Sequence, residues 1–180
     1  MNNRIVVDID NTLWDFAKAW WEYFKDVDPD VPPIELWDRW HFWERYPDKK
    51  MLHDTLKKVH LSQDKFLPYK GAKTFLTSLK KKGFYIIIAS HREQEALEVT
   101  LKWLHQHELP FDEIHISYDK SVLFTNCFAV IDDSPSVLQK AEEAGIVRAG
   151  LLNPWNKGTD HPLFDSLEEV LGYIEGQLQS

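Results

Sequence analysis

Short apolar runs alternate with amphipathic segments along most of the chain. The apolar runs are continuous, a pattern typical of strands that are covered on both faces, as in a parallel sheet. They predict five strands, at residues 4–8, 84–89, 113–116, 128–131 and 147–152. The amphipathic segments predict helices at residues 71–82, 94–106, 136–144 and 167–179. This order predicts an α/β fold with a doubly wound, Rossmann-like parallel sheet and right-handed crossovers.

Residues 16–70 interrupt this alternation. Helical patterns occur there without a clear strand, and five prolines break them. The same stretch holds five of the eight tryptophans, namely Trp20, Trp21, Trp37, Trp40 and Trp43. We therefore expect a small helical cap at residues 16–70, inserted after the first strand into a core formed by residues 1–15 and 71–180.

Composition narrows the possible partners and compartments. The 180 residues fit one domain with its own core, and 21 Lys and Arg against 29 Asp and Glu give a formal net charge of −8. This charge argues against binding to a nucleic-acid polymer or to an anionic membrane. The longest apolar run is too short to cross a bilayer, and the first residues lack a signal-peptide layout. A single cysteine, Cys127, excludes an internal disulfide, so we expect a cytoplasmic protein.

Polar clusters follow four of the predicted strands, at the point where each strand ends. In an open α/β sheet, ligands bind beyond the carboxyl ends of the strands, so we expect these clusters to share one edge of the sheet. The clusters are Asp8 to Thr12, then Ser90-His91-Arg92, then Asp119-Lys120, and finally Asp132-Asp133-Ser134-Pro135.

This set of side chains suits phosphoryl transfer through a carboxylate nucleophile. Asp8 and Asp10 are two positions apart, so an extended backbone points both to the same side. Asp8 can attack phosphorus to form an aspartyl-phosphate, and Asp10 can protonate the leaving oxygen and then deprotonate the hydrolytic water. Ser90 can hold phosphate oxygens, and Lys120 supplies positive charge.

Asp132 and Asp133 add two carboxylates to the same edge. Two carboxylates 4 Å apart repel each other by about 4 kcal/mol at an effective dielectric constant near 20. Lys120 alone cannot neutralise four carboxylates and a phosphate. A divalent cation can, and an all-oxygen ligand set favours Mg²⁺.

The clusters resemble, in order and in residue type, the four motifs of the haloacid dehalogenase (HAD) superfamily of phosphohydrolases. The resemblance implies that Asp8 is the nucleophile and Asp10 the acid/base. It also implies Mg²⁺ held by Asp8, by the carbonyl group of Asp10 and by Asp132, with Asp133 farther from the ion. Phosphate contacts are expected from Thr12, Ser90, His91 and Lys120.

Within that superfamily, three segments are similar to the cytosolic 5′(3′)-deoxyribonucleotidases and their bacterial relatives. They are Asp8 to Phe16, Lys102-Trp103-Leu104, and Tyr118 to Ser121 ahead of Val130 to Pro135. The similarity implies a 5′-nucleotidase that acts on (deoxy)nucleoside monophosphates. We expect substrate contacts from Phe16, Phe42, Trp43 and Arg92. Asn11 stands where many members have Gly, and Ser90-His91-Arg92 replaces the commoner Thr-Ser-Pro or Thr-Ser-Arg, so the substrate stays open.

Two alternatives remain. The first is a phosphatase of the same superfamily that acts on sugar phosphates or on phosphotyrosine-like aryl phosphates. The second is a binding protein that keeps the fold without turnover.

Overall fold

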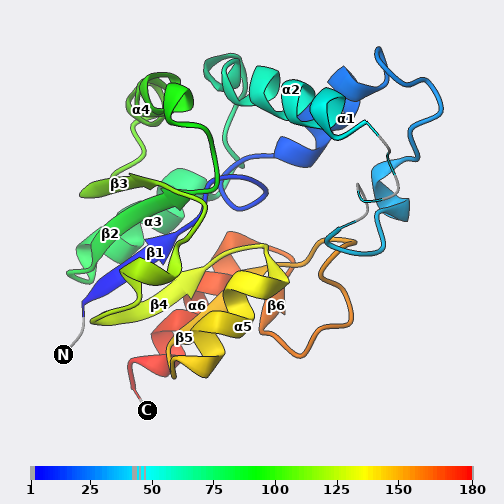
Figure 1. Cartoon of the computed structure of the whole chain (residues 1–180). Coiled ribbons are helices and arrows are strands. Elements are labelled where there is room, and N and C mark those ends of the chain that lie inside the picture. Colours follow the sequence, from blue (N-terminus) through cyan, green and yellow to red (C-terminus); the bar gives the residue numbers. More distant parts are fainter. Residues whose placement is uncertain (1–2, 42–43, 45, 47, 180) are drawn as a thin grey trace.

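A parallel six-stranded sheet forms the centre of the protein (Figure 1). This computed structural model describes residues 3–41, 44, 46 and 48–179. The strand order is β3-β2-β1-β4-β5-β6, and every neighbouring pair is parallel. The predicted α/β fold with a doubly wound sheet is confirmed. The strands are β1 (Arg4–Val7), β2 (Tyr85–Ser90), β3 (Glu113–Ile116), β4 (Cys127–Ile131), β5 (Val147–Leu151) and β6 (Leu163–Phe164).

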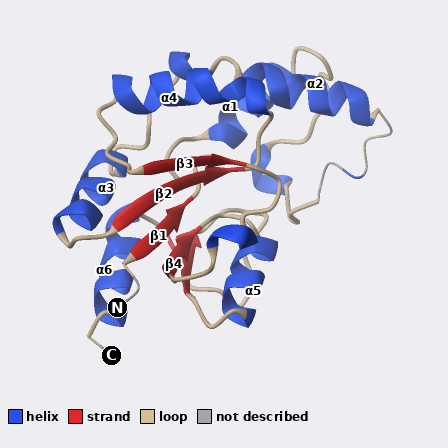
Figure 2. Ribbon diagram, turned by 60° about the vertical axis from the view of Figure 1, so that its left-hand side comes forward, coloured by secondary structure: helices blue, strands red, loops and turns tan. Residues whose placement is uncertain are grey.

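Helices cover both faces of the sheet (Figure 2). Helices α3 (Ala72–Lys81) and α6 (Leu167–Gln177) lie on one face, and α5 (Pro135–Glu143) lies on the other. Helix α4 (Leu97–Gln106) continues from the 3₁₀ turn η4 (Gln94–Ala96) and connects β2 to β3. Each predicted helix has its counterpart within a few residues, because its apolar face is buried.

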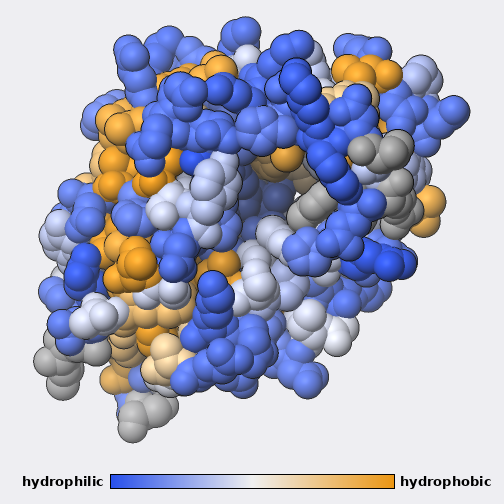
Figure 3. Space-filling model, viewed as in Figure 1, coloured by the Kyte–Doolittle hydropathy of each residue, from blue (hydrophilic) through white to orange (hydrophobic). Residues whose placement is uncertain are grey.

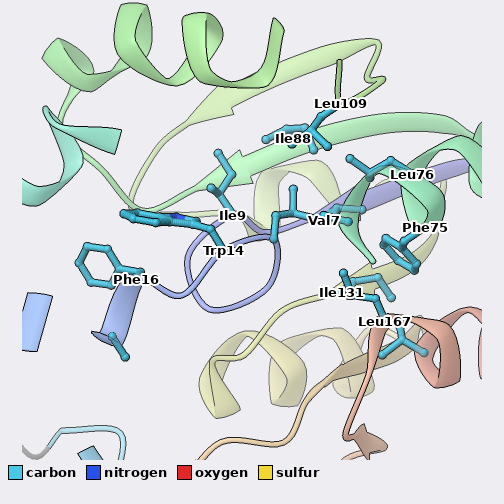
Figure 4. Packing of buried hydrophobic residues seen from close by; sticks show 14 of the residues in the cluster. Val7, Ile9, Trp14, Phe16, Phe75, Leu76, Ile88, Leu109, Ile131 and Leu167 are labelled. Carbon is cyan, nitrogen blue, oxygen red and sulfur yellow. The ribbon is translucent and has the colours of Figure 1, made fainter. Parts of the chain in front are cut away.

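Side chains of the central strands alternate between these two helical layers. Val7, Ile88 and Ile131 point into the layer that contains Leu76 and Leu167 (Figure 4). Val6, Ile87 and Val130 pack with α5 on the opposite face. A sheet buried on both faces explains why its strands are continuously apolar in the sequence.

The chain between β1 and α3 is helical and lies beyond the carboxyl ends of the strands (Figure 1). It contains α1 (Phe16–Phe24), η1 (Ile34–Leu36), α2 (Lys49–His60) and η3 (Gln63–Lys65). The indole Nε1 of Trp20 in α1 donates to Oγ1 of Thr55 in α2 at 2.9 Å, which joins the two helices. No helix in the described part of the chain is both long and apolar enough to cross a membrane.

Strand β6 is the one element of the sheet without a predicted counterpart. It has two residues, Leu163 and Phe164, and pairs with Gly150 and Leu151 of β5. A run of two residues has no periodicity that would predict a strand. It forms one because the chain returns to the edge of the sheet beside β5.

Candidate active site

Strand β1 leads directly into a tight loop that carries the two predicted catalytic residues, Asp8 and Asp10. Asp8 is still held by the sheet, because its amide donates to the carbonyl of Ile131 at 2.9 Å. Asn11 then adopts a left-handed backbone with φ of 57°, a conformation that asparagine tolerates better than most residues. The loop therefore places Asp8 and Asp10 at the carboxyl ends of the strands, while the backbone of Asp8 stays hydrogen-bonded to β4.

Lys120 lies between two buried carboxylates. Its Nζ atom is 2.5 Å from Oδ1 of Asp8 and 2.6 Å from Oδ2 of Asp132. Burial favours the neutral lysine, but the two carboxylates outweigh it and raise the pKa of Lys120 above its usual value. Burial raises the pKa of Asp8 to about 7, although the charge of Lys120 acts in the opposite direction.

A third carboxylate, Asp133, completes an acidic cluster. Burial and the neighbouring charges of Asp8 and Asp132 raise the pKa of Asp133 well above its usual value. Asp8, Asp132 and Asp133 each place one carboxylate oxygen within 4.8 Å of the other two. Three buried carboxylates with one lysine leave a deficit of positive charge, and oxygen ligands favour Mg²⁺, so these residues fit a magnesium ion.

Asp10 is held by a separate set of donors. Arg92 donates from Nη2 to Oδ1 at 2.5 Å and from Nε to Oδ2 at 3.2 Å. Trp14 Nε1 lies 2.9 Å from Oδ1, Ser90 Oγ lies 3.2 Å from Oδ2, and His60 Nε2 lies 3.3 Å from Oδ2. Burial raises the pKa of Asp10, but the charges of Arg92 and His60 outweigh it and hold the pKa well below its usual range.

The other predicted phosphate contacts occupy three different environments. Ser90 is fully buried, and its hydroxyl donates to Asp10. Thr12 is also fully buried, and its hydroxyl has no hydrogen-bond partner among the described residues. His91 lines the cavity, where burial and the nearby Lys120 lower its pKa to about 4.

The predicted substrate contacts also separate. Phe16 lines the cavity, and its ring stacks on that of His60 with a centroid distance of 4.8 Å. Arg92 is almost completely buried; its guanidinium contacts Asp10, Gln63 and Thr100. Phe42 and Trp43 lie outside the described residues.

A cavity of about 370 Å³ joins the acidic cluster to a wall of aromatic side chains. Figure 3 shows a hollow in the middle of one face of the molecule, bordered mainly by hydrophilic residues. The aromatic wall comes mostly from the segment between β1 and α3. Its members are Phe16, Trp20, Trp37, Trp40, His60 and, from the loop after β5, Trp155.

Several of these residues were not predicted as part of the site. His60 is the last residue of α2, and Trp155 follows β5 without a motif around it. Tyr118 belongs to a segment that resembles the family, but no role is predicted for it; it lines the cavity, and its ring stacks with that of His91 at a centroid distance of 6.5 Å. Their spacing along the chain does not predict that they line the cavity, because their positions depend on how segments distant in the sequence pack together. Trp155 did have one signal, its position beyond the carboxyl end of a strand.

Comparison with known proteins gives a family match over nearly the whole chain. Residues 2–174 match the sequence model of the family described as 5′ nucleotidase, deoxy (pyrimidine), cytosolic type C protein. No curated protein sequence matches the chain.

Solved structures of HAD-type proteins have the same fold. A HAD-superfamily hydrolase from Ehrlichia chaffeensis is 22% identical, with 99% of this chain and 98% of that one covered and a TM-score of 0.60. A predicted phosphatase from Clostridium acetobutylicum is 18% identical, with 97% and 98% covered and a TM-score of 0.68. The HAD-hydrolase YfnB from Bacillus subtilis, solved bound to magnesium, is 16% identical, with 96% and 98% covered and a TM-score of 0.64.

Proposed function

Since the chain belongs to the cytosolic type C family of 5′-nucleotidases, which are phosphoric monoester hydrolases of the HAD superfamily, we propose that it hydrolyses (deoxy)nucleoside monophosphates through an aspartyl-phosphate on Asp8. The observation that carries this proposal is the cavity itself, which connects the carboxylates of Asp8, Asp132 and Asp133 to an aromatic wall. The family description names a cytosolic type, which supports the expectation of a cytoplasmic enzyme.

In the first step, an oxygen of Asp8 attacks phosphorus, and the bond between phosphorus and the ester oxygen breaks. Lys120 contacts Oδ1 of Asp8, so we assign the attack to Oδ2. Mg²⁺ bound by Asp8, the Asp10 carbonyl and Asp132, with Asp133 nearby, would neutralise charge on the phosphate during this attack. The leaving ester oxygen takes a proton from Asp10, and a nucleoside departs.

In the second step, Asp10 removes a proton from water, which attacks the aspartyl-phosphate and releases inorganic phosphate. The contacts of Asp10 with Arg92 favour its ionised form, which is the form this step requires. For the first step Asp10 has to carry a proton, and its contacts with Arg92 oppose that form. Ser90, Thr12 and His91 remain our candidates for further phosphate contacts.

We propose that residues 16–70 act as a cap over this chemistry. Two ion pairs and a hydrogen bond join this segment to the loop and helix after β2. The ion pairs are Lys57 to Glu95 at 2.8 Å and Asp64 to Lys102 at 2.6 Å, and the hydrogen bond joins His53 Nε2 and Glu93 Oε1 at 2.6 Å. A closed cap excludes water while Asp8 attacks, and its aromatic side chains select the leaving group.

The aromatic wall supports a nucleoside as the leaving group, with its base bound against the aromatic rings. Flat aromatic rings in a cavity of a few hundred Å³ favour a planar partner through stacking and burial of apolar area. The indole N–H groups of Trp20 and Trp155 already donate to Thr55 and Asp133. These two side chains therefore offer a substrate ring surface and no free donor.

A phosphate-release assay over a substrate panel tests the proposal. The panel contains deoxynucleoside and nucleoside monophosphates, sugar phosphates and an aryl phosphate, each with Mg²⁺ and with a chelator. We expect Mg²⁺-dependent release that is fastest with nucleotides, and no release by Asp8→Asn, with Asp160→Asn as the control at an exposed position. Preference for sugar or aryl phosphates would instead support the first alternative, and absence of release from every ester would support a binding protein.

A further inference from the structure

One carboxylate oxygen of Asp133 accepts two hydrogen bonds, one from a residue near the start of the chain and one from a residue that follows β5. Asn11 Nδ2 donates to Oδ2 of Asp133 at 3.1 Å, and Trp155 Nε1 donates to the same oxygen at 3.1 Å. All three side chains are buried. With Oδ2 engaged by both donors, Oδ1 is the oxygen that remains for an ion or for its bound water.

The amide of Asn11 also reaches the first helix of the 16–70 segment. Its Oδ1 accepts from the backbone N–H of Ala17 at 2.7 Å, in the first turn of α1. The first N–H groups of a helix have no partner within it, so each needs an acceptor from elsewhere. The side chain of Asp15 accepts from the N–H of Lys18 in this way, and that of Asn11 accepts from the N–H of Ala17. The side chain of Asn11 therefore bridges Asp133 and the start of α1.

Trp155 makes a second connection to the same segment. Its ring packs against that of Trp37, with centroids 6.3 Å apart. The loop that carries Trp155 is held in place by the fully buried Asn156, whose Nδ2 donates to the carbonyls of Asp133 at 3.1 Å and Leu151 at 2.9 Å. Trp155 is thus fixed to β5 on one side and contacts the 16–70 segment on the other.

We propose that Asn11 and Trp155 are positioning residues that connect the carboxylate of Asp133, and through it the metal site, to the 16–70 segment. The proposal rests on the proposed function, because it requires Mg²⁺ at the acidic cluster. Residues that orient a ligating carboxylate commonly change metal affinity when they are removed. Because coupling between two sites is reciprocal, Mg²⁺ should also stabilise the start of α1.

Calorimetric titration with Mg²⁺ measures the first half of this connection without any turnover. Asn11→Gly removes both hydrogen bonds of the side chain while glycine accepts the positive φ. Trp155→Phe keeps an aromatic ring and removes only the N–H. Each change should weaken Mg²⁺ binding by about tenfold. Asn126→Gly is the matched control, because Asn126 has φ of 58° and is exposed at the opposite edge of the sheet, before β4.

Amide hydrogen exchange of Ala17, followed by NMR, measures the second half. In the wild-type protein, saturating Mg²⁺ should slow exchange of this amide, and Asn126→Gly should behave in the same way. In Asn11→Gly the amide should exchange quickly with or without Mg²⁺.

Two results would overturn the inference in different ways. The positioning role is wrong, and the metal site stands, if the wild-type protein binds Mg²⁺ but Asn11→Gly and Trp155→Phe bind it equally well. The same holds if Mg²⁺ binds but does not change the exchange rate of the Ala17 amide. If the wild-type protein binds no Mg²⁺, the metal site of the proposed function is wrong, and this inference with it.

Discussion

The guanidinium group of Arg92 contacts both carboxylate oxygens of Asp10, at 2.5 Å and 3.2 Å. Its Nη1 atom donates to Oε1 of Gln63 at 2.5 Å and to Oγ1 of Thr100 at 2.7 Å. Gln63 lies in η3, within the 16–70 segment, and Thr100 lies in α4. One buried side chain therefore links the proposed acid/base both to the core and to the proposed cap.

Arg92→Lys should slow turnover because lysine keeps the charge but cannot form the two-pronged contact with Asp10. A misplaced acid/base costs on the order of 100-fold in rate, so we expect kcat to fall by about that factor. KM should change little, since Arg92 is not among the residues that line the cavity. Steady-state kinetics measures both constants. Arg148→Lys, at an arginine that pairs with Glu142, is the control, and an unchanged kcat in Arg92→Lys would contradict the positioning of Asp10 by this residue.

Lys120→Met should destabilise the metal-free protein, because it leaves the carboxylates of Asp8 and Asp132 buried without their common partner. Loss of one partner of a buried ion pair costs about 3–5 kcal/mol. Mg²⁺ can replace the missing charge, so it should raise the Tm of this variant by more than it raises that of the wild type. Thermal unfolding with and without Mg²⁺ measures the difference. The exposed Lys140→Met serves as control, and equal Mg²⁺ effects on Lys120→Met and the wild type would refute the prediction.

The stability of the metal-free protein should fall as pH rises above about 6.5. Asp8 and Asp133 have raised pKa values in the folded protein, at about 7 for Asp8, so the folded state keeps protons that the unfolded chain has lost. Their contribution therefore decreases as pH rises through these values. Saturating Mg²⁺ should remove the decline, because the ion takes the place of the protons.

Two histidines oppose this trend at lower pH. Burial lowers the pKa of His60, and burial together with the charge of Lys120 lowers the pKa of His91 to about 4. Near and below pH 6.5 the unfolded chain therefore binds more protons at these two histidines than the folded protein does. Their contribution to stability rises with pH and levels off about one unit above pH 6.5, where the histidines of the unfolded chain are neutral as well. The two carboxyl groups act with the opposite sign over this range, and above it they alone remain. Urea unfolding in the presence of a chelator at pH 6.5 and pH 8 tests the sign. A protein that is equally or more stable at pH 8 would contradict it.

Phe16→Ala should reduce the preference for nucleotides over small phosphate esters. The Phe16 ring lines the cavity and stacks on His60, and an aromatic pair contributes about 0.5–1.5 kcal/mol beyond the area it buries. We expect kcat/KM for nucleoside monophosphates to fall by about tenfold, with little change for a phosphate ester that lacks a ring. Phe84→Leu, next to Phe128 and directly before β2, controls for the loss of a core ring. A substrate profile identical to that of the wild type would argue against base stacking on Phe16.

The order of strands and helices could be predicted because it depends on local patterns. The apolar runs that became β1, β2 and β4 are continuous, and each is followed by the polar residues that now surround the acidic cluster. The rule that parallel strands share their carboxyl edge was enough to place Asp8, Lys120 and Asp132 together. The roles of these residues stay predictions until the variants are measured.

The partners of individual side chains could not be predicted in the same way. The motif positions of Arg92 and Asp10 predict different tasks for the two residues, and nothing in the spacing indicates that they form a pair. The Oδ2 atom of Asp133 likewise accepts from Asn11 and Trp155, which lie far apart in the chain. Buried polar atoms take whichever donors the packing brings within reach, and that packing joins distant segments.

Periodicity and strand-end chemistry thus specified the architecture, the edge that carries the acidic residues and the kind of ion they favour, because these follow from the local pattern of each strand and from the residues directly after it. The aromatic wall, the clamp of Arg92 on Asp10 and the bridge of Asn11 to α1 arise where the 16–70 segment packs against the core. Their geometry depends on contacts between segments dozens of residues apart, which only the folded chain brings together.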